Sequence, residues 1–138
     1  MAKSKWKQFH MHENILRILN DKSLKSGHHF GISYLTPYQI AIFLEKTSKS
    51  DFDGLDKEIG GKGTGEYHSV AQYIANQLSR RIKNKEIKDI EGAFISHKYH
   101  DSLIFKYEPR LIEASTKDIS DLSIFRNKYI SSCCQGDK

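Results

Sequence analysis

The segment from Thr64 to Lys83 contains the residues of this chain whose types and spacing best fit binding chemistry. Its apolar residues recur every three or four positions, the spacing of a buried helix face: Tyr67, Val70, Ala71, Ile74, Ala75, Leu78 and Ile82. The opposite side carries short hydrogen-bonding groups, with cations towards the C-terminal end: His68, Ser69, Gln72, Asn76, Ser79, Arg80 and Lys83. A solvated helix face is usually rich in Glu and Lys. A polar face without an acid therefore favours contact with a polar, anionic surface.

The side chains on this polar face match the hydrogen-bonding groups of nucleic acid bases. Gln72 and Asn76 can each form a bidentate pair with adenine, and Arg80 can do so with guanine; each good pair discriminates by roughly 1–3 kcal/mol. Phosphate contacts would come from the cations that flank the helix, Lys62, Arg81, Lys83 and Lys85. The backbone N–H groups of the glycine-rich entry, with the positive end of the helix dipole behind them, would favour the same anion. The simpler alternative is a polar face that meets only water.

Composition is that of a small soluble protein. Its 138 residues favour one domain, and 38% of them are hydrophobic, enough for a single core. Lys and Arg number 22 against 17 Asp and Glu, and the resulting net charge of +5 and pI near 9.1 are compatible with nucleic acid. No apolar run approaches the roughly 20 residues that span a bilayer, and the basic N-terminus lacks the apolar stretch of a secretory signal. The adjacent Cys133 and Cys134 provide no disulfide framework, so we expect a cytoplasmic protein without membrane contact.

Two helices and a long loop are expected before this segment. A mobile basic arm over residues 1–8 leads into a first helix from Phe9 to about Leu24, indicated by its apolar spacing. Between Ser48 and Gly65 the chain is polar and rich in glycine, which predicts mainly loop with at most a short helical turn.

The second helix has the clearest start signal in the chain. Thr36 is placed to serve as N-cap, and Pro37 follows at the first helical position, where its missing N–H costs nothing. Gln39 can complete a capping box with Thr36. The helix is therefore expected to begin at Pro37.

Strands and then a helix are expected after residue 89. Ile90–Ser96 and Ser102–Tyr107 read as strands, and residues 97–101 would join them as a hairpin. Capped by Thr116 or Ser120, a last helix would hold Ile119, Leu122, Phe125 and Tyr129. The expected organisation is a flexible arm, a main domain, a C-terminal helical extension and a disordered tail, over residues 1–8, 9–108, 109–131 and 132–138.

The order of these elements resembles a winged helix-turn-helix domain, over about Phe9 to Tyr107. More narrowly, the sequence YLTPYQIAIFLEK, the stretch GGKGTG and a helix ending in RRIKNK look like the winged-helix modules of the HARE-type group, found beside restriction and chromatin proteins. The resemblance implies an α+β fold in which three helices are followed by a β-hairpin, with a C-terminal helix added. It also implies that Thr64–Lys83 is the recognition helix in the major groove and that His97–Asp101 is the tip of the wing.

The residues and the resemblance together predict a non-catalytic protein that binds double-stranded DNA. With two residues from the wing, the predicted contacts are Lys62, Thr64, His68, Ser69, Gln72, Asn76, Arg80, Lys83, Lys98 and Tyr99. Transcriptional regulation, or a role beside a restriction or mobile-element system, is the expected setting. A homodimer through the C-terminal helix would match paired half-sites. The alternative is a winged-helix module that binds another protein and not DNA.

Catalytic and metal sites are not indicated by the remaining motifs. The chain has seven histidines, but a structural zinc site usually takes four Cys or His ligands at fixed spacing, and both cysteines lie in the tail. The glycines before the helix do not form a P-loop, because Gly63 follows Lys62 where Ser or Thr is required. Neighbouring Ser and His residues do not by themselves give the geometry of a catalytic triad. We therefore expect no enzymatic activity, no metal and no cofactor.

Overall fold

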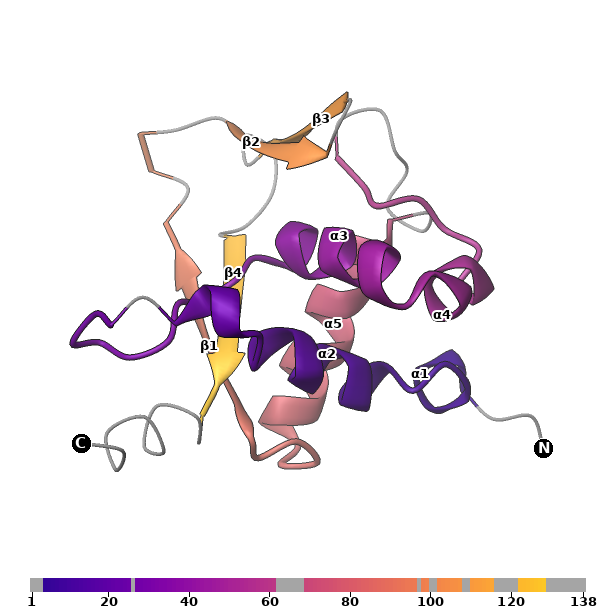
Figure 1. The fold of residues 1–138 in the computed structure, drawn as a ribbon, viewed down its shortest axis with the longest axis horizontal. Coiled ribbons are helices and arrows are strands. Elements are labelled where there is room, and N and C mark those ends of the chain that lie inside the picture. Colours follow the sequence, from indigo (N-terminus) through magenta and orange to yellow (C-terminus); the bar gives the residue numbers. More distant parts are fainter. Residues whose placement is uncertain are drawn as a thin grey trace.

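Helices come first along the chain and strands follow, so the protein is α+β as the sequence predicts (Figure 1). The computed structural model describes residues 4–25, 27–61, 69–96, 98–99, 102–107, 110–115 and 122–128. Its helices are α1 (Lys5–Gln8), α2 (Met11–Leu19), the 3-10 helix η1 (Lys22–Leu24), α3 (Pro37–Thr47), α4 (Lys49–Gly54) and α5 (Val70–Lys83). Its strands are β1 (Ile90–Ile95), β2 (Ser102–Tyr107), β3 (Arg110–Ser115) and β4 (Leu122–Asn127).

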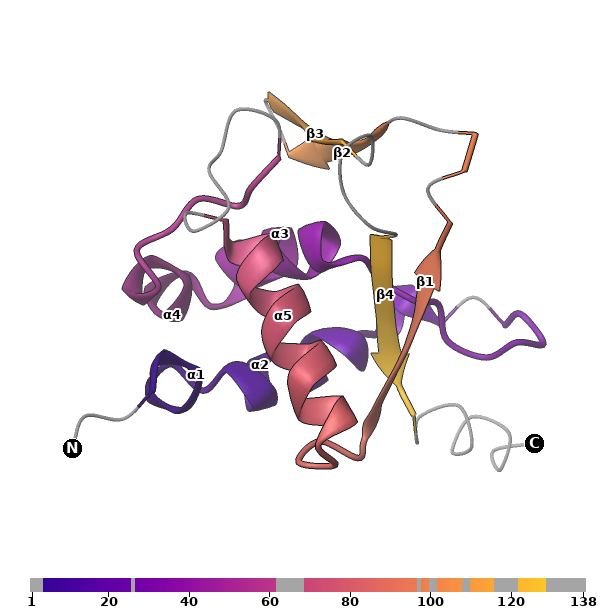
Figure 2. The same ribbon diagram turned by 180° about the vertical axis from the view of Figure 1, so that it is seen from behind.

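The hydrophobic core lies between α2, α3 and α5 and extends to the strands β1 and β4 (Figures 1 and 2). Its fully buried helical side chains are Met11, Ile15, Ile18, Leu19, Ile40, Leu44, Val70, Ile74 and Leu78. Full burial of an aliphatic side chain of this size contributes about 1.5–3 kcal/mol to folding. The apolar spacing of the sequence therefore identified the buried faces correctly, although the first predicted helix ends at Leu19 and resumes only as η1.

The start of α3 follows the predicted capping pattern. The Gln39 N–H donates to Thr36 Oγ1 at 3.2 Å, and the Thr36 N–H donates to Gln39 Oε1 at 2.8 Å. Pro37 occupies the first position of the helix, as expected. The capping box fixes where α3 begins, and α5 then packs across α3.

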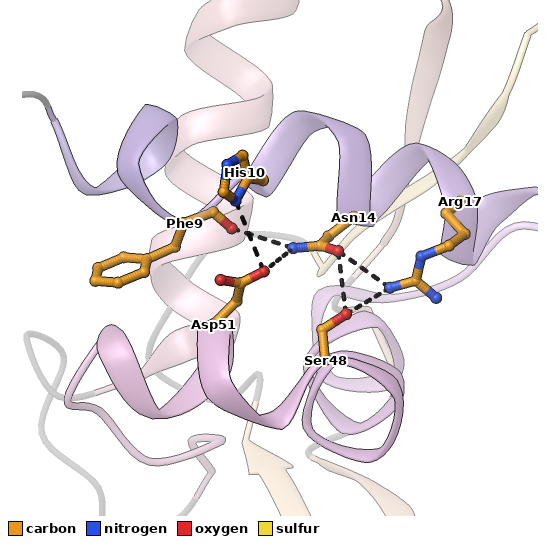
Figure 3. A network of polar contacts seen from close by, with 6 residues as sticks. All are labelled: Phe9, His10, Asn14, Arg17, Ser48 and Asp51. Atoms are coloured by element: carbon orange, nitrogen blue, oxygen red, sulfur yellow. Dashed lines mark hydrogen bonds and ion pairs between the residues drawn. The ribbon is translucent and has the colours of Figure 1, made fainter.

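A polar network joins α2 to the junction of α3 and α4 (Figure 3). The Asn14 side chain is 8% exposed, and its Nδ2 donates to the Asp51 carboxylate at 2.8 Å and to the Phe9 carbonyl at 3.1 Å. Its Oδ1 accepts from Arg17 and from the Ser48 hydroxyl, both at 3.1 Å. A buried amide with all of these partners costs little to desolvate. The network therefore fixes how α2 lies against the two helices that precede α5.

The strands pair differently from the prediction. β1 pairs antiparallel with β4, from Ile90 opposite Asn127 to Ile95 opposite Leu122, and β2 pairs with β3. The predicted hairpin of β1 and β2 is therefore wrong, although both strands exist. Alternating residues identify a strand and its faces but carry no information on its partner.

The ribbon formed by β1 and β4 contacts the helical body through Leu35, just before α3. The Leu35 N–H and carbonyl both bond to Phe125 of β4 at 2.8 Å. Leu35 and β1 thus lie on opposite edges of β4. The segment just before α3 therefore joins the same small sheet.

A separate hairpin of β2 and β3 lies along α3 (Figure 1). The ring of Phe105 stacks on that of Tyr38 with centroids 5.4 Å apart, and the Tyr107 hydroxyl donates to Glu45. This hairpin occupies the stretch between the two strands of the ribbon.

The predicted C-terminal helix is also wrong, because residues 122–127 form β4. Phe125 is 2% exposed and lies opposite Gly92 in the ribbon. A Cβ on Gly92 would lie 3.1 Å from the Phe125 ring, so glycine lets that ring lie across β1. The homodimer expected through a C-terminal helix loses its basis, and the tail 132–138 lies outside the described residues.

The predicted basic arm is wrong for residues 4–8. The Ser4 side chain caps α1, and Trp6 is 4% exposed, 6.2 Å from the ring of Tyr73 in α5. The lysines around Trp6 suggested an arm, but burying one large aromatic side chain is enough to hold a short helix on the core. α1 therefore borders one side of α5.

Candidate nucleic-acid interface

The first turn of α5 is fixed by bonds to the chain before it. Ser69 caps the helix, because its Oγ accepts from the Gln72 N–H at 3.0 Å. The Val70 and Ala71 N–H groups donate to the carbonyls of Glu58 at 2.7 Å and Ile59 at 2.9 Å. Ser69 is therefore the N-cap of α5.

These bonds correct one expectation about DNA contact. Ser69 is 6% exposed and caps the helix, so it does not belong to the exposed face of α5. The N–H groups of Val70, Ala71 and Gln72 have acceptors within the protein, so they are not available to a phosphate. Phosphate contact is expected at the glycine-rich entry before the helix, and residues 62–65 of that entry lie outside the described residues.

α5 lies in front of the other helices in Figure 2, and one side of it is exposed from Asn76 to Lys83. It carries four of the predicted contacts, Gln72, Asn76, Arg80 and Lys83. Gln72 is half-buried and the other three are exposed. They recur at intervals of three or four residues and so form one row on the helix.

Three of these side chains are oriented by hydrogen bonds within the helix. Gln72 Nε2 donates to Asn76 Oδ1 at 3.1 Å, which leaves Gln72 Oε1 and Asn76 Nδ2 without a partner among the described residues. Gln77 Oε1 accepts from the Arg80 guanidinium at 2.9 Å. The linked amides thus leave one acceptor and one donor available.

Arg81 belongs to the body of the protein and not to the exposed row. Its guanidinium carbon lies 4.9 Å from the centroid of the Trp6 ring, and its Nη1 donates to Glu86 at 2.8 Å. Its side chain is only 14% exposed. Burial also raises the pKa of the neighbouring Tyr73, against an opposing effect of Arg81 and then Arg80. The phosphate contact expected of Arg81 is therefore wrong.

Acids beside the C-terminal end of α5 are each engaged within the protein. Glu86 bonds to Arg81, Asp89 lies 3.0 Å from the His12 ring nitrogen, and Glu91 bonds to Arg126 across the ribbon. Where the residues are described, no ion pair engages four nearby exposed lysines, Lys83, Lys85, Lys88 and Lys128. This end of the molecule therefore presents uncompensated positive charge.

Sequence reasoning missed two of these lysines. Lys88 and Lys128 line a shallow hollow with Lys85, where α5 gives way to β1 and β4 ends. The position of Lys88, five residues beyond Lys83, was a signal that could have been used. No comparable signal in the sequence pointed to Lys128, because only the pairing of β4 with β1 brings this residue to the same end of α5.

The predicted wing residues lie apart from this basic end. Lys98 and Tyr99 follow β1, whose six residues span roughly 20 Å. Tyr99 is 95% exposed, and the Lys98 ammonium lies 5.3 Å from the centroid of its ring. Both residues are accessible, but they do not join the row on α5. Lys62, Thr64 and His68 lie outside the described residues.

Other kinds of site find no support in the described part of the chain. No group of three or more His, Cys, Asp and Glu side chains there could hold a metal ion. None of the helices described is long and apolar enough to span a membrane. No protein-family model, curated protein or solved structure matches the chain.

Proposed function

We propose that this protein binds double-stranded DNA without catalysis, through the exposed row of α5. The observation that carries the proposal is this row, Gln72, Asn76, Arg80 and Lys83, continued by the unpaired lysines beyond the helix. Amide and guanidinium groups read base edges in the major groove, and lysines engage phosphates. The acids that would repel DNA here are already paired with groups of the protein itself.

The arrangement of elements supports a winged-helix reading of the same surface. Helix, extended segment, helix and longer helix follow in this order, with the short α4 before the longer helix, and in this reading the ribbon of β1 and β4 would be the wing. In this reading the hairpin of β2 and β3 is an insertion between the two strands of the wing. The proposed setting is a cytoplasmic transcriptional regulator, or a factor beside a restriction or mobile-element system.

A matched pair of charge reversals tests the surface. Lys83→Glu should weaken binding to a mixed-sequence duplex by roughly tenfold or more, because it removes one phosphate contact and adds repulsion. Lys22→Glu makes the same change on η1, outside the proposed surface, and should have much less effect. Fluorescence anisotropy at low salt measures both. Equal losses in the two variants would show that net charge matters and that α5 does not.

A protein-interaction module is the second candidate, because apolar side chains are exposed beyond α5. Phe94 is 67% exposed on β1, Ile104 is 62% exposed on β2 and Leu111 is 67% exposed on β3. Exposed aromatic and aliphatic groups are typical of protein contacts. Wild-type protein that binds no duplex at low salt would favour this candidate.

A further inference from the structure

β1 is an edge strand whose outer side has no partner among the described residues. It pairs with β4 on one side only, while Leu35 occupies the other edge of β4. From Gly92 to Ile95 every residue of β1 is exposed, and Phe94 keeps 67% of its surface. The sequence of the strand, IEGAFI, contains no Lys and no Pro. Natural edge strands usually carry such residues, which prevent pairing with another chain.

The backbone groups on the open edge follow from the bonds of Phe125. Both its N–H and its carbonyl point away from β1, because they bond to Leu35. Opposing residues of an antiparallel pair alternate between bonded and non-bonded pairs, so Gly92, opposite Phe125, is not bonded to β4. The N–H and carbonyl groups of Gly92, and of Phe94 two residues later, therefore point outwards.

We propose that β1 pairs antiparallel with β1 of a second copy of this chain, with Gly92 of one copy opposite Phe94 of the other. In this register the exposed Phe94 ring lies beside Gly92, which has no side chain, and next to the Phe125 ring that packs against Gly92 from β4. Both Gly92 and Phe94 have outward backbone groups, so each can bond directly to the other across the two-fold axis.

A second copy fits this edge better than an unrelated peptide because the strand is complementary to itself. Glu91 would lie opposite Ile95, and its carboxylate is already bonded to Arg126 within its own chain, so no like charges meet. Pairing about a two-fold axis takes up the open β1 edge of each copy, and Leu35 already occupies the other edge of each β4. No edge of the ribbon is then left for a third copy. The assembly therefore closes as a dimer. An interface of one strand pair is small, so the dimer should be weak.

Sedimentation equilibrium of the full chain, without DNA, tests the pairing. Over about 10 µM to about 1 mM, where weak association is detected, the average mass should rise from 15.9 kDa towards twice that value. Phe94→Pro removes an outward N–H and should keep the protein monomeric, since proline is tolerated on the open edge of a strand. Phe94→Lys should also keep the protein monomeric, because of the positive charge that it adds to the edge. Circular dichroism checks that each variant folds.

The matched control is Ile104→Lys, which adds the same charge at an equally exposed apolar residue on β2. It should dimerise as the wild type does. A wild type that stays monomeric over the whole range would overturn the proposal. So would a dimer that survives both Phe94 variants, or one that Ile104→Lys disrupts as much as Phe94→Lys does. Loss of DNA binding has no bearing on any of these outcomes.

Discussion

Single side chains on α5 are set in position by their neighbours before any ligand arrives. Gln72 and Asn76 share one hydrogen bond, and the oxygen of the first and the amide nitrogen of the second have no partner among the described residues. Adenine presents one donor and one acceptor in the major groove, so the linked amides match it as a unit. Gln77 likewise limits the positions open to the Arg80 guanidinium. Fewer rotamers then need to be fixed on binding, which favours affinity.

The linked amides predict a non-additive loss of sequence preference. Gln72→Ala and Asn76→Ala should each reduce discrimination at the same base pair by roughly 1–3 kcal/mol, and the double variant should lose little more than either alone. Arg80→Ala should relax preference at a different base pair. Selection from a random duplex pool with each variant measures these preferences. Additive losses at two separate base pairs would show that the amides act independently.

The buried amide of Asn14 predicts a large effect on stability. Asn14→Ala leaves Asp51, Arg17 and Ser48 each short of one bond, and Asp51 and Ser48 are half-buried, so the free energy of unfolding should fall by about 1–3 kcal/mol. Asn20→Ala, at the exposed end of α2, is the matched control and should change stability far less. Urea denaturation of the two variants provides the comparison. A cost for Asn14→Ala no larger than that of the control would contradict the role given to the network.

At the scale of elements, local signals proved reliable and long-range pairing did not. The capping box of α3 and the buried face of α5 were predictable because each depends on residues within a few positions of one another. The segment of β4 was mistaken for part of a helix because Leu122 and Phe125, with Ile119 and Tyr129 on either side, also fit helical spacing. Only the contacts of Phe125 with Gly92 and Leu35 identify the segment as a strand.

The candidate site likewise contains residues that could be predicted from local spacing and residues that could not. The exposed row on α5 was predictable from its spacing, whereas two misassigned residues depended on contacts with distant parts of the chain. Ser69 is buried by the segment around Ile59, and Arg81 is held by Trp6. Neither partner could be identified from spacing along α5 alone.

The start of α5 predicts a separable effect on helix stability. Ser69→Ala removes the cap and the hydroxyl bond to the Ile59 carbonyl, and should cost about 0.5–2 kcal/mol. Ser79→Ala lies on the exposed side of the same helix and should be neutral or slightly stabilising, since alanine is the better helix former. Thermal unfolding followed by circular dichroism distinguishes them. Equal effects would mean that Ser69 does not fix the start of α5.

For the whole molecule, charge is distributed unevenly although the net excess is modest. A net charge of +5 on 138 residues does not itself indicate a nucleic acid partner. The acids near the end of α5 are paired internally, so the lysines there contribute their full charge to one side of the protein. The same side bears the hydrogen-bonding row of α5, so the groups proposed to read bases and those proposed to bind phosphates lie together.

Salt dependence of binding to a mixed-sequence DNA duplex tests the central claim most directly. If α5 and the lysines beyond it engage the DNA backbone, the logarithm of the association constant should fall linearly as the logarithm of salt concentration rises. Each phosphate contact contributes a slope of about −0.9, and Lys88→Ala or Lys128→Ala should each reduce the slope by about one contact. Binding that is absent at low ionic strength, or that does not weaken with salt, would contradict the account.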